Sequence, residues 1–184
     1  GALMPDAHTG YGLPIGGVLA TKNVVIPYAV GMDIACRMKM TVMDMPVSAI
    51  RGKEGRLRNV LEEATRFGVG GGFSPRKDHP VMAEDWSFSP VTRQFRDKAS
   101  YQLGSSGSGN HFAEFGTLTV AQDDLGLKAG VYCALLTHSG SRGTGGQIAT
   151  HYSKLAMEFH PELPRELLQL AWLDLDSDAG REYW

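Results

Sequence analysis

The sequence is poor in cysteine and has no long hydrophobic run. Only Cys36 and Cys133 occur among 184 residues, so a disulfide framework is not expected, and free thiols favour a reducing, cytoplasmic setting. No apolar run approaches the ~20 residues that a membrane helix needs, and the first residues lack the pattern of a secretory signal. The net charge of −2 argues against a globally basic nucleic-acid binder, although a local basic groove remains open.

Glycine is the residue in excess, with 23 positions in the chain. It makes up about 12% of the residues against an average of ~7%. Most of these glycines gather in four short clusters, at 10–17, 68–72, 104–109 and 140–146. Clustering of this kind predicts tight loops in which the backbone approaches a ligand or another segment closely.

The spacing of apolar residues predicts a mixed architecture. Strands are expected at 24–26, 36–42 (half-buried), 118–121 and 131–137 (fully buried), and helices at 56–67, 92–103, 147–159 and 164–175. Residues before 24 and residues 73–90 are expected to be loops, and Gly68 is expected to end the first helix. Without a repeat or a linker, the simplest interpretation is one α+β domain over residues 1–184. Exposed apolar ends suggest that this domain is incomplete at both ends.

The first segment with the residues for chemistry contains Asp33 and Cys36. A carboxylate and a thiolate three residues apart can converge on one metal ion where a loop enters a strand. Thiolate suits zinc, iron, copper or nickel, and carboxylate admits manganese or magnesium. The alternative is a capping Asp33 beside a packed Cys36, which is favoured when this segment is taken alone.

The second segment is Gly107–Glu114. Its glycines can expose backbone N–H groups to a phosphate, His111 could bind a metal, and Glu114 could contact a nucleobase or hold a ligand in place. The alternative is a polar hairpin turn with Asn110 in a left-handed conformation.

The third segment is Thr137–Gly143. His138 ends a predicted strand, so a rigid element would deliver its side chain into a loop-built site. Arg142 in a Gly/Ser loop could bind phosphate through its planar guanidinium group. The alternative is a turn from strand to helix in which Ser141 or Thr144 caps the helix.

Taken together, the three segments favour a metal site over three independent turns. Its predicted ligands are Asp33, Cys36, His111 and His138. Of the remaining histidines, His8 could contact substrate, whereas His79, His151 and His160 are expected at the surface. A Ser–His nucleophile is not supported, since no G-x-S-x-G elbow occurs, and the glycine run at 70–72 lacks the Lys and Ser/Thr of a P-loop.

These segments also carry a family resemblance. The matching blocks are Met4–His8 with Gly10–Gly17, Val30–Cys36, Gly107–Glu114 and His138–Gly143. In this order they resemble the signature motifs of the RtcB-type RNA ligases, over the whole chain but only the central part of the family's length.

The resemblance implies an RtcB-like fold and an enzyme that joins RNA 3′-phosphate or 2′,3′-cyclic phosphate ends to 5′-hydroxyl ends, in tRNA splicing or RNA repair. It implies GTP and two Mn²⁺ ions as cofactors, a guanylylated histidine, RNA as partner and an archease-like activator as a further one. Carried over by motif, Cys36 would bridge the two ions held with Asp33, His111 and His138. Asp6 and Asn110 would be catalytic residues, and the nucleotide would be contacted by Asn110, Glu114 and Arg142.

The chain departs from the family pattern at several positions. Arg37 stands where many members have Gly, Gly146 replaces a frequent His, and Pro27–Gly31 differs from the usual Gly-rich segment, which indicates a divergent subgroup. No segment corresponds to the family's nucleotide-accepting histidine, so that nucleophile is expected outside residues 1–184 and this chain alone is expected to be inactive. A metal-dependent phosphoesterase and a non-catalytic RNA-binding fragment are the alternatives.

Overall fold

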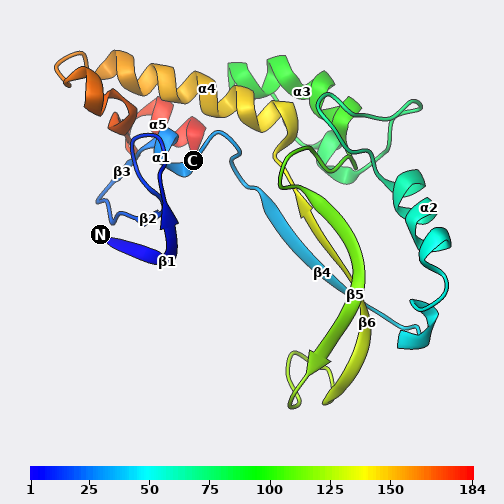
Figure 1. Ribbon diagram of the computed structural model, residues 1–184. Helices are drawn as coiled ribbons and strands as arrows, with labels where there is room; N and C mark the ends of the chain where they lie inside the picture. Colours follow the sequence, from blue (N-terminus) through cyan, green and yellow to red (C-terminus); the bar gives the residue numbers. More distant parts are fainter. The chain divides into compact units, whose positions relative to one another are not determined.

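The computed structural model describes all residues from Gly1 to Trp184, in two compact units (Figure 1). Unit 1 comprises Gly1–Ile34, Pro80–Asp97 and Gly143–Trp184. Unit 2 comprises Ala35–His79 and Lys98–Arg142. None of the helices combines the length and apolar character that crossing a membrane requires.

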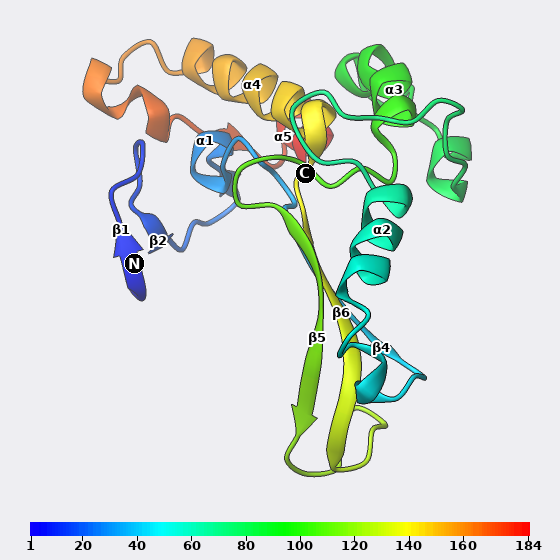
Figure 2. The ribbon, with the colours of Figure 1, turned by 45° about the vertical axis from the view of Figure 1, so that its right-hand side comes forward.

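Unit 2 is built on a three-stranded antiparallel sheet in the order β4–β6–β5 (Figures 1 and 2). Its strands are β4 (Arg37–Met43), β5 (Phe112–Val120) and β6 (Gly130–Ser139). In the central strand, His138 pairs with Met38 on one side and Phe112 on the other. The three strands therefore meet at one end of the sheet, where β4 and β5 begin and β6 ends.

The sheet is less buried than the sequence pattern predicts. Cys133 and Ala134 are buried, but Val131 on the same strand is 56% exposed, so the prediction of a fully buried strand is wrong. The strand predicted at 36–42 is present as β4, yet Met38 and Met40 are about half exposed. The apolar alternation predicts the strand correctly but not how much of it is covered: within this unit, α2 packs against β5 and η1 against β6.

Helix α2 (Glu54–Ala64) follows a 3₁₀ turn, η1 (Val47–Ala49), and ends earlier than predicted. Thr65 is extended (φ −132°, ψ 175°), so Gly68 does not end the helix; its N–H instead donates to the Gly107 carbonyl. Arg66 donates to the carbonyls of Glu62 and Glu63, and Lys77 to that of Ala64, which caps the free carbonyls of the last turn. Both cations also lie over the buried ring of Phe73, 4.7 and 4.3 Å from its centre.

Unit 1 begins with a hairpin of β1 (Ala2–His8) and β2 (Ile15–Val18), where the sequence predicted a loop. The pairing is irregular between Leu3 and His8, a stretch that contains Pro5. Most hairpin side chains are exposed, so the strands need no apolar alternation, and the Gly/Pro punctuation concealed them. The strand predicted at 24–26 is present as β3 (Val24–Val25), followed by a short helix α1 (Pro27–Val30).

The core of unit 1 gathers β3, β7 (Leu173–Asp174) and two helices. These helices are α3 (Pro90–Gln102), which belongs to unit 1 up to Asp97, and α4 (Arg142–Phe159), which belongs to it from Gly143. The other elements of unit 1 are η2 (Pro80–Ala83), η3 (Arg165–Leu170) and α5 (Asp178–Tyr183). The buried cluster consists of Val25, Val91, Tyr152, Ala156, Ala171 and Leu173. Leu173 is 1% exposed and lies in β7, paired with Val25 of β3, so the helix predicted through Leu175 is wrong. Tertiary pairing overrides the helical spacing here.

The α+β class is confirmed, and the main errors concern element ends. The strand predicted at 118–121 starts six residues earlier, at Phe112. The helix predicted at 147–159 starts five residues earlier, at Arg142. Arg142 lies in the Gly-rich segment 140–146, and Phe112 closely follows the glycine cluster at 104–109. Local propensity assigns such segments to loops.

Candidate metal centre

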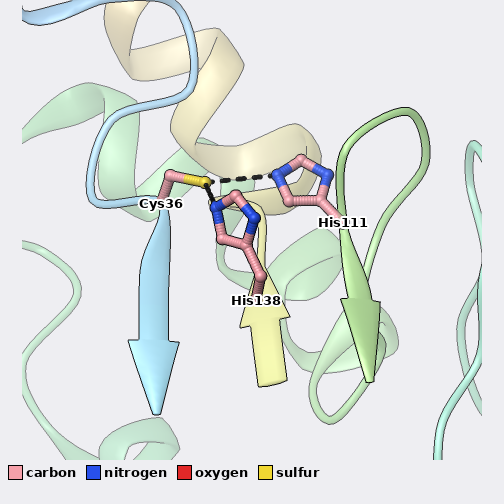
Figure 3. A group of neighbouring side chains, drawn as sticks. All are labelled: Cys36, His111 and His138. Carbon is pink, nitrogen blue, oxygen red and sulfur yellow. Dashed lines mark hydrogen bonds between the residues drawn. The ribbon is translucent and has the colours of Figure 1, made fainter. Parts of the chain in front are cut away.

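Three side chains of unit 2 converge at the end of the sheet where β4 begins and β6 ends (Figure 3). Cys36 immediately precedes β4, His111 immediately precedes β5, and His138 is the penultimate residue of β6. Their ligand atoms all lie within 4.8 Å of one another, and all three residues are half-buried. An antiparallel sheet thus brings together residues separated by up to 102 positions.

The sulfur atom of Cys36 faces both imidazole rings. Sγ lies 2.7 Å from Nε2 of His138 and 3.3 Å from Nε2 of His111. The two rings contact each other edge to face, with centres 5.1 Å apart. The rings of Phe112 and His138 also contact each other edge to face, with centres 5.7 Å apart, so Phe112 packs against the His138 ring.

Backbone carbonyls fix the orientation of both rings from behind. Nδ1 of His111 donates to the Ser108 carbonyl at 2.7 Å, and Nδ1 of His138 donates to the Asn110 carbonyl at 3.1 Å. Because a carbonyl can only accept, each Nδ1 carries a proton and each neutral ring presents its Nε2 lone pair to the sulfur. This is the arrangement that metal-binding histidines adopt.

These donors fit a metal ion. One thiol proton cannot serve two imidazole acceptors, whereas a cation bound by one thiolate and two imidazoles satisfies all three together. Thiolate and imidazole ligands suit zinc, iron, copper or nickel, and a hard ion such as manganese would also need oxygen donors. A catalytic thiol paired with one histidine is less well supported, since it leaves the second fixed ring without a role.

Gly107 leaves the space that the His111 ring occupies. A Cβ on Gly107 would lie 2.6 Å from Nδ1 of His111 and 3.1 Å from a terminal nitrogen of Arg142. Its φ of +139° is also unfavourable for other residues. Glycine is thus required here by both close approach and conformation, a role that the glycine cluster at 104–109 signals only in general terms.

Arg142 is held by the glycine loop at 68–71. Its guanidinium donates to the carbonyls of Gly68 and Gly71, both at 3.3 Å. This loop lacks the residues of a P-loop, and the structure shows a different use for it, as an anchor for a cation beside His111. Sequence reasoning missed this pairing because nothing local links positions 71 residues apart.

The other predicted site residues fall in two groups. In unit 2, Asn110 is exposed and supplies the carbonyl that holds His138, while Glu114 is exposed on the His138 face of the sheet. Asp6 and Asp33 belong to unit 1, and their roles in the site remain predictions.

His160 differs from its predicted surface position. Its side chain is 15% exposed and lies against the Trp172 ring, with centres 3.7 Å apart. His79 and His151 are exposed, as predicted.

The fold and the site define an α+β protein with a Cys/His/His cluster suited to a metal ion. The model of one family, described as tRNA-splicing ligase RtcB, matches residues 1–184, and the chain belongs to this family. The resemblance in the motifs is thereby confirmed.

Curated relatives from archaea and bacteria match most of the chain. It is 29% identical to the tRNA-splicing ligase RtcB of Archaeoglobus fulgidus, over 99% of this chain and 46% of the relative. It is 31% identical to that of Nanoarchaeum equitans, over 98% and 46%, and 31% identical to RNA-splicing ligase RtcB1 of Escherichia coli, over 85% and 40%. The chain therefore spans less than half the length of these relatives.

Proposed function

We propose that this chain supplies the metal-binding part of an RNA ligase of the RtcB type. The observation that carries the proposal is the Cys36–His111–His138 cluster with both Nδ1 atoms fixed, in a chain that the RtcB family model matches from end to end. The reaction is the joining of RNA 3′-phosphate or 2′,3′-cyclic phosphate ends to 5′-hydroxyl ends, in tRNA splicing or RNA repair in the cytoplasm. An archease-like activator would be a further partner.

The residues of the site divide the work by their chemistry. Cys36, His111 and His138, with Asp33, would hold two Mn²⁺ ions, and bound divalent cations neutralise the charge of a transferring phosphoryl group. Glu114 is an exposed carboxylate two positions along β5 from the His138 partner Phe112, where it can accept hydrogen bonds from a guanine base. Arg142 would bind phosphate through its guanidinium fork. Asn110 orients His138 through its carbonyl, and its amide can contact the nucleotide phosphates; Asp6 would act at the edge of the site.

The test is covalent labelling with GTP in the presence of Mn²⁺. The full-length protein is expected to acquire a GMP label that resists denaturation and to join a 2′,3′-cyclic phosphate RNA to a 5′-hydroxyl RNA. Residues 1–184 alone are expected to remain unlabelled, because the nucleophilic histidine is expected outside them. A labelled band from residues 1–184 would overturn that placement and bring His8, His79, His151 and His160 back into consideration.

Two other functions would give different experimental results. A phosphoesterase built on the same ligands would release phosphate in a metal-dependent manner without joining RNA. A non-catalytic RNA-binding protein would bind RNA equally well in the presence of a chelator and would show neither activity.

A further inference from the structure

The two compact units carry opposite net charges. Unit 2 contains twelve of the eighteen Lys and Arg residues and eight of the twenty acidic residues, which gives it a net charge of +4. Unit 1 contains the other six cations and twelve acids, which gives it −6. The overall charge of −2 therefore conceals a basic unit, and the candidate metal centre belongs to that unit.

The cations of unit 2 are concentrated between β4 and the first turns of α2. Four of the eight residues from 51 to 58 are basic: Arg51, Lys53, Arg56 and Arg58, here called the basic strip. All four side chains are exposed, and none forms an ion pair. The one acid among them, Glu54, accepts a hydrogen bond from the Gly52 N–H at 3.0 Å, and residues 51–58 keep a net charge of +3 (four cations and one acid).

The local structure keeps the basic strip directed to solvent. Leu57 and Leu61 are the partly buried residues of α2, and Arg56 and Arg58 flank Leu57 on the two sides of that apolar stripe. The strip also lies at the amino end of α2, where the helix dipole adds positive potential. Nothing in unit 1 repeats this density of unpaired cations.

The basic strip is connected to the metal centre by β4. This strand leaves the centre beside Cys36 and extends over seven residues to Met43, a length of about 20 Å. It carries two more exposed cations, Arg37 and Lys39, which pair with Ser139 and Thr137 and so lie on the face opposite His138. These two cations thus lie on the opposite face of the sheet from His138, with Asp44 as the one acid between Lys39 and Arg51 along the chain. The length of β4 separates the strip from the centre by a distance that a short substrate does not span.

We propose that the basic strip binds the sugar–phosphate backbone of RNA away from the end that reacts, an inference that rests on the proposed function. Long, flexible cations on an exposed surface neutralise phosphates and fix the path of a strand. The strip has no aromatic residue on which a base could stack, so its contribution is independent of nucleotide sequence. RNA is favoured over an acidic protein because phosphates recur along its backbone and because two of the family relatives are named as RNA-splicing ligases.

The test compares two variants with equal loss of charge. In the strip variant, Arg51, Lys53, Arg56 and Arg58 are replaced by Gln; in the control, Lys22, Arg93, Lys154 and Arg165 of unit 1, also exposed, are replaced by Gln. Binding of the full-length protein to an RNA hairpin is measured by fluorescence anisotropy over a range of salt concentrations, with EDTA present. The strip variant is expected to bind RNA at least tenfold more weakly at low salt. Its log–log salt slope should fall by about 3, since each lost phosphate contact removes ~0.7 to 0.9.

A wild-type salt slope and affinity in the strip variant would overturn the proposal, as would an equal loss in both variants. Retained RNA binding with loss of binding to polyglutamate would indicate an acidic protein partner instead and would also overturn it. Ligation is measured in a separate assay, with either a dinucleotide or a long RNA as the acceptor. If the wild-type protein does not ligate RNA but only the strip variant loses RNA affinity, the proposed function fails and the inference about the basic strip stands. Thermal unfolding confirms that both variants fold.

Discussion

The sulfur of Cys36 lies 2.7 Å from Nε2 of His138, although 102 positions separate the two residues. Their approach follows from the register of β4 and β6, in which Arg37 pairs with Ser139 and Met38 with His138. The cluster is therefore set by strand pairing, and its ring orientations by the loop carbonyls of Ser108 and Asn110. Each contribution can be removed separately.

Replacing Cys36 by Ser should sharply reduce bound metal. A hydroxyl is a much poorer ligand than a thiolate for the ions that this donor set favours. Removing a residue that only orients a metal ligand typically lowers metal affinity ~10- to 100-fold, and loss of a ligand itself should cost at least as much. The measurement is metal content by elemental analysis of the full-length protein. Cys133→Ser is the matched control, because Cys133 is fully buried and lies elsewhere on β6. Unchanged metal content in Cys36→Ser would show that this cysteine only packs.

His111 and His138 should act as ligands and not as general bases. Alanine at either position is expected to lower metal content and ligase activity together, by tenfold or more. His151→Ala, which alters an exposed ring of unit 1, should change neither. Full metal occupancy with lost activity in His111→Ala or His138→Ala would assign a proton-transfer role instead.

The sequence predicts the three residues of this cluster, but not the contacts that surround them. Cys36, His111 and His138 were recognisable because metal-binding residue types occur in Gly-rich loops next to strands. The Arg142 contacts with Gly68 and Gly71 depend on tertiary pairing, which local patterns do not contain.

The fold shows the same division. The sequence predicts β4 from its alternation of apolar and polar residues and β6 from its apolar run. It does not predict the β1–β2 hairpin, which is exposed and punctuated by Gly and Pro. The segment around Leu173 has helical spacing, but it forms a strand because pairing with β3 buries this side chain in the core.

Replacing Gly107 by Ala should damage the metal centre without removing a ligand. The new Cβ would lie 2.6 Å from Nδ1 and 2.9 Å from Cγ of His111, so the ring must turn away from the Ser108 carbonyl. We expect a loss of metal affinity of ~10- to 100-fold, as for other changes to groups that orient ligands. Metal titration of the purified protein measures it.

Gly109→Ala is the control for backbone strain alone. Gly109 also has a positive φ, +72°, but no atom lies within 4 Å of its added Cβ. This variant should lose about 1 kcal/mol of stability and keep its metal affinity. Equal affinity losses in Gly107→Ala and Gly109→Ala would show that strain, and not contact with His111, causes the effect.

Tyr183 should make the protein sensitive to alkaline pH, and Tyr183→Phe should stabilise it. Burial raises the pKa of Tyr183 to about 12, above the ~10 of an unfolded chain. The stability contributed by the neutral phenol is therefore complete below about pH 10 and is lost as the pH rises toward 12. Its buried hydroxyl has no hydrogen-bond partner, so Phe removes an unsatisfied group, with an expected gain of about 1 kcal/mol at pH 7.

Tyr152→Phe is the matched control: the Tyr152 ring contacts that of Tyr183, but its hydroxyl donates to Glu182 at 2.9 Å, so this change should cost about 1 kcal/mol. Urea unfolding between pH 7 and 11.5 measures both effects. A Tyr183→Phe protein less stable than wild type at pH 7, or with the same alkaline loss, would show that the Tyr183 hydroxyl is not an unsatisfied buried group.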